Sequence, residues 1–254
     1  MDLTAVLALC IGLLMVFISH IVEGGSISVL LQPTAFLIVI GGSFCAALLN
    51  FDYKTVKNAF ITAKKIFYPH ENNTTKVIND IIQLSRFARK NGIFALQDSI
   101  NDIQDSFLRR AIQLAIDVNN PQLLYEVLSA EIIYDEEQDL RSSKVFEALG
   151  GYAPTFGIVG AVIGLIQVMS NIKNIHLLGS GIATAFVATL YGVGFANLIL
   201  LPIAGNLKLK TREKVLLKEL ILQGVISILI QEHPAIVEEK LISYLKFHYV
   251  KNEI

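Results

Sequence analysis

The sequence predicts an all-α membrane protein with four transmembrane helices, a helical cytoplasmic domain between spans 2 and 3, and a cytoplasmic C-terminal helix. Of its 254 residues, 53% are hydrophobic and 17% are charged, whereas soluble domains carry about 25% charged residues. The apolar residues gather in two blocks, 3–49 and 152–204, separated by a long stretch of ordinary polarity. That stretch has helical periodicity and no β-hairpin pattern.

Residues 1–49 form the first predicted transmembrane hairpin. Leu3 to Val22 is a run of 20 residues without Asp, Glu, Lys or Arg, which as a helix extends about 30 Å, the thickness of a hydrocarbon core. A polar turn at Glu23 to Ser26 precedes a second uncharged run, Val29 to Leu49. The N-terminus has neither a basic region nor a small-residue cleavage site, so we expect the first run to remain as a membrane helix.

Residues 152–204 form the second predicted hairpin. The third span begins with the apolar run from Tyr152 to Val168, and the fourth lies within the run from Leu178 to Ala204. Small residues recur in both spans at spacings of three and four, which favours close helix–helix contact in lipid. Packing within the chain itself would explain most of them: Gly157, Gly160, Ala161 and Gly164 in the third span, and Gly181, Ala185, Ala188, Gly192 and Ala196 in the fourth.

Basic residues near the span ends predict the orientation, because cytoplasmic flanks carry an excess of Lys and Arg. Such residues follow the second and the fourth spans, while the hairpin links contain only Lys173. We therefore expect both termini and the central domain to be cytoplasmic. The flanking residues are Lys54, Lys57, Lys64 and Lys65, and then Lys208, Lys210, Arg212, Lys214 and Lys218.

Residues 50–151 are the predicted cytoplasmic domain. Amphipathic periodicity predicts helices at Thr75 to Phe87 and at Asp105 to Asp117, with Gly92 between them placed as a C-cap. A break at residues 119–120 then leads into a long helix from Pro121 to Leu149.

Residues 205–254 are the predicted C-terminal part. One long helix continues from the fourth span, a break falls at His233 and Pro234, and a short amphipathic helix from Ala235 to Tyr249 follows.

The sequence contains no motif of a hydrolase, a metal site, a phosphate loop or a dinucleotide fold, and its five histidines are scattered. We therefore expect neither an enzyme nor a bound metal or cofactor. A net charge of −1 argues against nucleic acid as a partner. Cys10 and Cys45 lie inside apolar runs, where we expect small buried hydrophobes rather than a disulfide.

No Asp or Glu lies inside any of the four spans, so the chain by itself offers no carboxylate to a transmembrane proton relay. Hydroxyl and amide side chains could instead line a wet path or bond a neighbouring helix, or could simply bond back to their own helix. They are Thr155, Gln167, Thr184, Thr189, Tyr191 and Asn197. Spacing alone predicts a helix start at Pro154 and a helix stop at Pro202.

Two long runs carry a resemblance to a known family. Gly150 to Ile166 closely resembles the third-span signature of flagellar stator A subunits, the MotA/PomA family of the MotA/TolQ/ExbB proton channel superfamily. Gly181 to Gly194, followed by Leu201 to Ala204, resembles the fourth-span signature. The resemblance covers nearly the whole chain and is weakest at residues 60–80.

The resemblance implies a stator subunit in the bacterial inner membrane that converts ion flow into torque on the flagellar rotor. Five copies would surround two copies of a B subunit (MotB/PomB-like), whose membrane helix supplies the ion-binding Asp, and the cytoplasmic domains would push on a rotor switch protein (FliG-like). The alternatives are an energy-transducing scaffold of the ExbB/TolQ type, which usually has three spans, and an assembly scaffold without ion flux.

The resemblance also implies roles for single residues. Pro154 and Pro202 match two functional prolines, and Thr189 matches a threonine near the ion path, which with Thr155 would also contact the partner helix. Ala161 stands where sodium-driven members tend to have threonine, which favours protons over Na⁺.

Arg89 and Lys90 match the basic pair of the rotor contact. The family's acidic partner would fall at Gln97. The adjacent Asp98 is the expected substitute, although a shift of one residue turns it about 100° around a helix.

Overall fold

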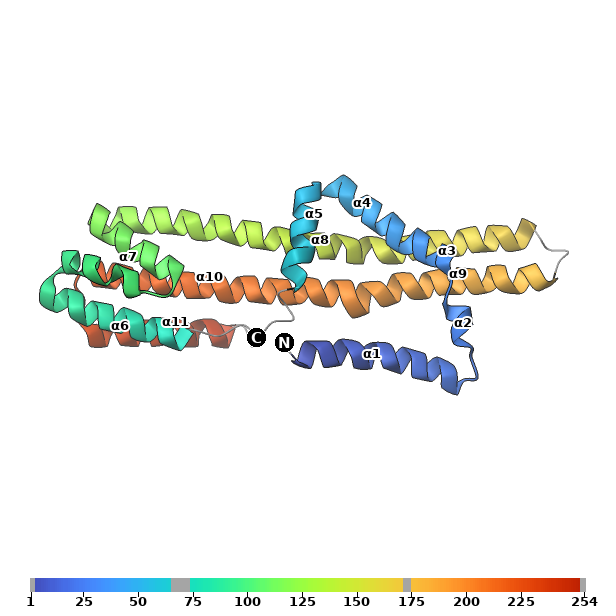
Figure 1. Ribbon diagram of the computed structural model, residues 1–254, viewed down its shortest axis with the longest axis horizontal. Helices are drawn as coiled ribbons and strands as arrows, with labels where there is room; N and C mark the ends of the chain where they lie inside the picture. The colour runs from blue at the N-terminus through green and yellow to red at the C-terminus, as the bar shows by residue number, and fades with distance from the viewer. Residues whose placement is uncertain (1–2, 65–73, 171–174, 252–254) are drawn as a thin grey trace. The chain divides into compact units, whose positions relative to one another are not determined.

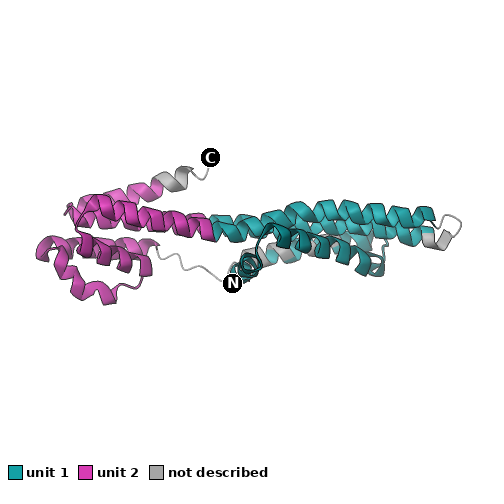
Figure 2. Ribbon diagram, turned by 90° about the horizontal axis from the view of Figure 1, so that it is seen from above, with its two compact units in different colours: residues 1–69, 139–209 teal, residues 70–138, 210–254 magenta. Residues whose placement is uncertain are grey.

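The computed structural model describes residues 3–64, 74–170 and 175–251, and every regular element in these ranges is helical (Figure 1). The chain divides into two compact units (Figure 2). Unit 1 comprises residues 1–69 and 139–209, and unit 2 comprises residues 70–138 and 210–254. Each unit therefore draws on two stretches that are far apart in the sequence.

The helical segments that lie wholly in unit 1 are mostly short, because the second span is subdivided. They are α1 (Leu3–Val22), α2 (Ile27–Leu30), α3 (Pro33–Phe36), the π-helix η1 (Leu37–Gly41), α4 (Gly42–Asn50), α5 (Tyr53–Lys64), α9 (Ile175–Phe195) and the π-helix η4 (Ala196–Leu200). Parts of α8 (Pro121–Ser170) and α10 (Leu201–Leu229) complete it.

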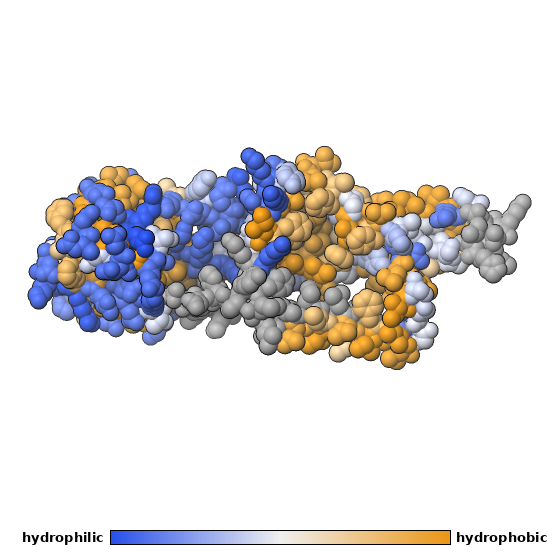
Figure 3. All heavy atoms as spheres, viewed as in Figure 1, coloured by the Kyte–Doolittle hydropathy of each residue, from blue (hydrophilic) through white to orange (hydrophobic). Residues whose placement is uncertain are grey.

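Three helical stretches are long and apolar enough to cross a membrane, namely 27–50, 121–170 and 178–229. A shorter apolar stretch, Cys10–Val22, lies in α1. In Figure 3, hydrophobic residues dominate the visible surface of unit 1 around α1 to α4 and α9, whereas hydrophilic residues dominate that of unit 2. Many large apolar side chains of unit 1 are exposed, including Met15, Leu37, Ile158, Ile166 and Phe186.

The second span differs from the uninterrupted run expected between Val29 and Leu49. Its helix stops at Leu30 and restarts at Pro33, with Leu31 and Gln32 outside helical structure. Proline disfavours helical conformation in the residue before it and suits the first position of a helix. Pro33 therefore explains both the break and the restart.

Small residues hold α8 against α9. A Cβ atom added to Gly192 would lie 2.6 Å from the Ala153 carbonyl oxygen, and one added to Gly164 would lie 2.9 Å from the Gly181 carbonyl oxygen. Backbones that approach this closely leave room only for glycine. The prediction that packing within the chain uses these small residues is thus confirmed for these positions.

Aromatic side chains fix α5 to its neighbours in unit 1. The ring of Phe60 lies 6.3 Å from that of Phe44 in α4 and 5.1 Å, edge-on, from that of Phe146 in α8. Phe146 is almost fully buried. Tilted and edge-to-face aromatic pairs of this kind stabilise by about 0.5–1.5 kcal/mol beyond the area they bury.

Unit 2 has a conventional apolar core. It is built from α6 (Thr74–Asn91), the 3₁₀ segment η3 (Ile93–Asp102), α7 (Ser106–Val118), α11 (Pro234–Lys251) and parts of α8 and α10. Side chains that are wholly or almost wholly buried include Ile81, Leu108, Leu124, Leu220 and Ile228. In contrast to unit 1, large aliphatic residues from every helix meet there.

The helices of unit 2 begin and end close to the predicted positions, although α6 continues beyond Phe87 to Asn91. Gly92 has a φ of +87°, and Asn119 adopts the left-handed conformation that ends α7. Asp105 caps α7 by accepting a hydrogen bond from the backbone N–H of Leu108 at 2.8 Å. The helix expected to end at Leu149 instead runs on through Gly150 and Gly151 to Ser170.

Candidate functional site

Both prolines lie within helical structure, which corrects the expectations from spacing. Pro154 is inside α8 rather than at a helix start. Pro202 is the second residue of α10, which follows η4 directly, so it does not end the helix. A proline ring clashes with the carbonyl four residues earlier, here that of Leu198. Leu198 belongs to the π-helix η4, where the N–H of Leu201 bonds the carbonyl of Ala196, and this wider turn accommodates the ring.

Thr155 and Thr189 both present exposed side chains. The Thr155 hydroxyl donates to the Tyr152 carbonyl at 2.7 Å, and the Thr189 hydroxyl donates to the Ala185 carbonyl at 3.3 Å. The hydroxyl protons are therefore used within the helix, as the simpler interpretation expected. Each oxygen can still accept a hydrogen bond from outside, and the exposed positions leave space for a neighbouring helix or a water path.

The close packing of α8 and α9 places Pro154 and Thr189 at adjacent levels. A Cβ on Gly192 would lie 3.1 Å from the Cα of Pro154, and one on Gly157 would lie 3.4 Å from the Cα of Thr189. Thr155 is next to Pro154 in the chain. These three predicted residues therefore form one cluster.

Ala161 and Pro202 lie at other levels of the same hairpin. Ala161 follows Gly160, where a Cβ would meet the Cβ of Ala188 at 2.7 Å. Pro202 follows Leu201, whose side chain lies against Gly150, one helical turn before Pro154. The five residues thus lie along the hairpin rather than around one point.

A polar cluster completes the break in the second span. The sequence predicted that Tyr191 and Thr184 could bond a neighbouring helix, but it did not point to Gln32 as their partner. The Tyr191 hydroxyl donates to the Leu30 carbonyl and accepts from the backbone N–H of Gln32 at 3.4 Å. The Thr184 hydroxyl lies 3.4 Å from Oε1 of Gln32. Unpaired backbone groups are costly inside a bilayer. The Tyr191 hydroxyl therefore provides hydrogen bonds to backbone groups that an uninterrupted helix would have paired. In the sequence, a polar residue followed by proline inside an apolar run, here Gln32 and Pro33, is the pattern that could have indicated this break.

The predicted rotor-contact residues lie in unit 2. Arg89 and Lys90 occupy the last turn of α6 with exposed side chains, where cations interact favourably with the helix dipole. Gln97 and Asp98 are exposed on η3.

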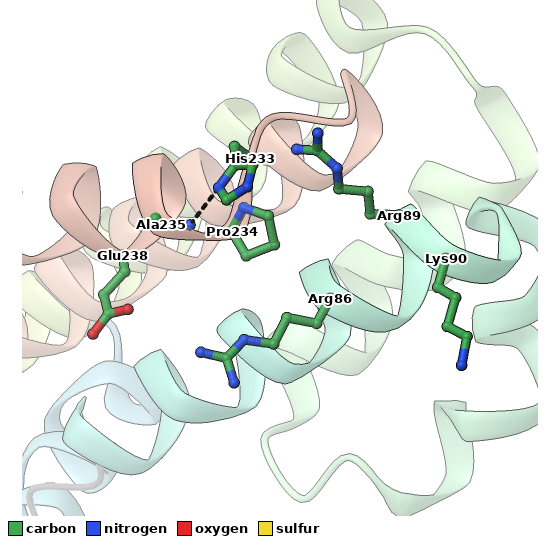
Figure 4. Close-up of a pocket in the computed structure, with 7 residues that line it drawn as sticks. All are labelled: Arg86, Arg89, Lys90, His233, Pro234, Ala235 and Glu238. Atoms are coloured by element: carbon green, nitrogen blue, oxygen red, sulfur yellow. Dashed lines mark hydrogen bonds between the residues drawn. The ribbon is translucent and has the colours of Figure 1, made fainter.

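A cleft of about 430 Å³ includes Arg89 and Lys90 but not Asp98. Its remaining lining was not predicted and consists of Arg86, His233, Pro234, Ala235 and Glu238 (Figure 4). Arg86, one helical turn before Arg89, could have been found from spacing. The contribution of α11 depends on tertiary packing that no local pattern encodes.

Two further polar interactions in unit 2 join its helices to one another. Lys218 pairs with Asp135 and lies 4.9 Å above the ring centroid of Phe107. The Tyr244 hydroxyl donates to Glu219 at 2.8 Å, and burial together with this carboxylate raises the pKa of Tyr244 above its ordinary value. These groups hold α8, α10 and α11 together rather than forming a site.

The structure also bears on the cysteines and on metals. Cys10 and Cys45 are exposed on the surface of the single chain, so the expectation of buried positions is wrong. Uncharged spans leave apolar faces uncovered by the chain itself, and both cysteines lie on such faces. Within the ranges described, no three His, Cys, Asp or Glu residues gather in a way that could hold a metal ion.

Comparison with known proteins identifies the family. Residues 99–219 match the MotA/TolQ/ExbB proton channel family, and residues 6–92 match the motility protein A N-terminal family. Motility protein A of Bacillus subtilis (strain 168) is 32% identical over 249 residues, which cover 96% of this chain and 91% of that protein. This chain belongs to the motility protein A family.

Solved structures agree with this membership. A MotAB structure from C. jejuni superposes with a TM-score of 0.90 and 27% identity, covering 96% of each chain. The flagellar MotAB stator complex from Bacillus subtilis gives a TM-score of 0.88 and 32% identity, covering 98% of this chain and 99% of that one. The motility protein A fold therefore extends over both units.

Proposed function

We propose that this chain is the A subunit of a flagellar motor stator, surrounding a MotB-like B subunit and forming the ion path with it. The likeness to MotAB stator complexes over nearly the full length of the chain carries this proposal. The match to the motility-specific N-terminal family favours it over an ExbB/TolQ scaffold, since residues 99–219 alone fit the broader channel family.

The working arrangement is an inner-membrane protein with four spans and both termini cytoplasmic. α1 supplies the first span, the stretch from α2 to α4 the second, the apolar part of α8 the third, and α9 with η4 the fourth. Basic residues that follow the second and fourth spans support this orientation. A map of single-cysteine accessibility that gave three spans would contradict it.

In the ion path, this chain supplies the wall and the B subunit supplies the titrating Asp. The exposed hydroxyls of Thr155 and Thr189 lie beside Pro154, where a partner helix can reach them. Ala161, further along the same wall, supports protons as the coupling ion. Each elementary charge that crosses releases about 2.3 kcal/mol per 100 mV, which would drive rotation of the A subunits around B.

Rotation of flagella in living cells tests the function. Deleting the gene in a strain with no second stator set should leave flagella that form but do not turn, and the full-length gene should restore rotation. Normal swimming after the deletion would refute the proposal.

Ion flux separates a motor from a passive scaffold. We expect co-expression with a B subunit that lacks its plug segment to acidify the cytoplasm above background. No acidification would favour a scaffold without ion flux.

A further inference from the structure

The short helix α5 lies crosswise to the long helices of its own unit. In Figure 1 its axis runs across α8, whereas α8 and α9 run alongside each other. The crossing is a direct contact, because the ring of Phe60 in α5 packs edge-on against that of Phe146 in α8 at 5.1 Å. The apolar part of α8 is the proposed third span, so α5 lies roughly parallel to the membrane surface.

The contact between α5 and α8 is at the level where the proposed spans end. Phe146 precedes Tyr152, the start of the third span, by six residues, or about 9 Å along a helix. One turn before Phe146, the Ser143 hydroxyl donates to the carbonyl of Ala204, which ends the fourth span, at 3.0 Å. The headgroup region lies just outside the hydrocarbon core. This level therefore corresponds to the lipid headgroups on the cytoplasmic side.

One face of α5 is fixed to the protein. The side chains of Val56, Ala59 and Ala63 are buried. Asp52, immediately before α5, caps the helix by accepting hydrogen bonds from the hydroxyl and the backbone N–H of Thr55, which hold the pKa of Asp52 below its ordinary value. The helix is thus held in place with its other side facing outward.

The outward side of α5 combines basic and apolar side chains. Its exposed residues recur at spacings of three and four, which places them on one helical face. They are Tyr53, Lys57, Phe60, Ile61 and Lys64. Helices that lie in the membrane interface carry aromatic and aliphatic residues together with lysines, whose long side chains reach the headgroups. The outward face of α5 has this composition.

This face continues the apolar surface of the second span. Phe44 in α4 is exposed, and its ring lies 6.3 Å from that of Phe60, which is also exposed. Leu49, near the end of α4, is 91% exposed. Exposed apolar side chains therefore lead without interruption from α4 onto α5, which favours the bilayer rather than a soluble protein as the neighbour of this face.

The charge of α5 is not neutralised in the part of the chain that the structure describes. The helix contains Lys54, Lys57 and Lys64 and no acidic residue. None of the three lysines forms an ion pair with a described residue. The carboxylate before α5 is bonded as described above, and Glu147, next to Phe146 in α8, pairs with Lys208. The lysines are therefore available to external anions.

We propose that α5 is a binding surface for anionic phospholipid headgroups, with Lys57 and Lys64 contacting lipid phosphate groups. Each lysine close to an anionic membrane surface contributes a roughly fivefold preference. Acyl chains below the headgroups cover the apolar residues between the two lysines, which free phosphate cannot do. The bound lipid holds the cytoplasmic end of the second span at a fixed depth. The inference rests on the proposed arrangement of spans and not on torque generation.

Fluorescence quenching by lipids tests the proposal, because the chain contains no tryptophan. Tyr53→Trp places a reporter on the outward face of α5, where Tyr53 is 70% exposed. The full-length variant, assembled with a tryptophan-free B subunit, is reconstituted in vesicles of phosphatidylcholine and phosphatidylglycerol in which one of the two lipids carries bromine. Per molecule, brominated phosphatidylglycerol should quench roughly two- to fivefold more strongly than brominated phosphatidylcholine.

Substitutions of the two lysines in the reporter chain test the role of charge. Lys57→Gln combined with Lys64→Gln should bring the quenching ratio of the two lipids close to one. Lys57→Arg combined with Lys64→Arg is the matched control, which keeps both charges and should keep the ratio. Added salt should lower the ratio in the parent and in the arginine variant, because it screens exposed charges.

A second reporter position controls for unspecific quenching. Tyr125 is exposed on α8, 27 residues before Tyr152, which is about 40 Å along the same helix. Tyr125→Trp should therefore be quenched by neither brominated lipid.

The outcomes separate this proposal from the stator function. Absence of quenching of Tyr53→Trp, equal quenching by both lipids, or an unchanged ratio in the glutamine variant would each overturn the lipid proposal. Loss of the ratio with inorganic phosphate, but not with chloride at the same ionic strength, would assign the lysines to free phosphate instead. Swimming of the deletion strain decides the stator function alone, and it leaves the quenching result unchanged.

Discussion

In unit 1 the helices α8 and α9 meet through glycine and alanine, whereas in unit 2 the helices meet through leucine, isoleucine and phenylalanine. Unit 1 leaves most of its large apolar side chains on the outside, whereas unit 2 buries a larger share of them in one core. Lipid provides no hydrophobic force between helices, so close backbone contact must hold them together. Water does provide that force, so a core of large side chains suffices. The contrast shows which solvent each unit is built for.

Removing buried side-chain volume from unit 2 should give the largest loss of stability. Leu108 is fully buried in α7, so Leu108→Ala deletes apolar contacts and leaves a cavity, at a cost of about 2–5 kcal/mol. Leu123→Ala is the matched control, because that side chain is 45% exposed in the same unit. Protease resistance of the purified full-length chain in detergent measures both variants. Equal losses would mean that unit 2 is not held together by this core.

Adding side-chain volume between α8 and α9 in unit 1 should give the second-largest loss of stability. In Gly192→Ala the new methyl group would lie 2.6 Å from the Ala153 carbonyl oxygen, which forces α8 and α9 apart and should destabilise the hairpin by about 1–3 kcal/mol.

Gly194→Ala, also in α9, is the matched control, since its Cβ meets nothing within 4 Å. It should be neutral or stabilise by up to about 1 kcal/mol through helix propensity. Thermal unfolding in detergent measures the pair. If both substitutions behaved alike, backbone contact would not be what joins the two helices.

Sequence reasoning succeeded where one strong local signal decides the structure. The helix boundaries of unit 2 were predicted closely because single residues set them. These residues act through their own conformations or side chains: Gly92, Asp105 and Asn119. Sequence reasoning failed where a distant residue decides. The cleft that Glu238 lines together with α6 does not follow from local pattern, because it depends on packing between segments far apart in the chain.

The candidate site divides along the same line. Motif resemblance proposed Thr155, Thr189 and the two prolines as site residues, and the structure shows that Pro154, Thr155 and Thr189 lie close together. No motif pointed to Gln32, because the break in the second span becomes tolerable only once Tyr191 from another span reaches it. Whether a polar group in one helix finds a hydrogen-bond partner in another depends on how the helices pack, which local sequence does not encode.

The smallest expected effect concerns this break. Tyr191→Phe removes the hydroxyl that bonds the Leu30 carbonyl and the Gln32 N–H, while it keeps the ring and its packing. Interhelical hydrogen bonds in membranes average about 0.6 kcal/mol and reach about 1.7, so we expect a loss of about 1 kcal/mol in detergent unfolding. Tyr152→Phe is the matched control, because no hydrogen bond to the Tyr152 hydroxyl occurs in the described part of the chain. A larger loss than in Gly192→Ala would mean that polar completion, not small-residue packing, is the main support of the membrane unit.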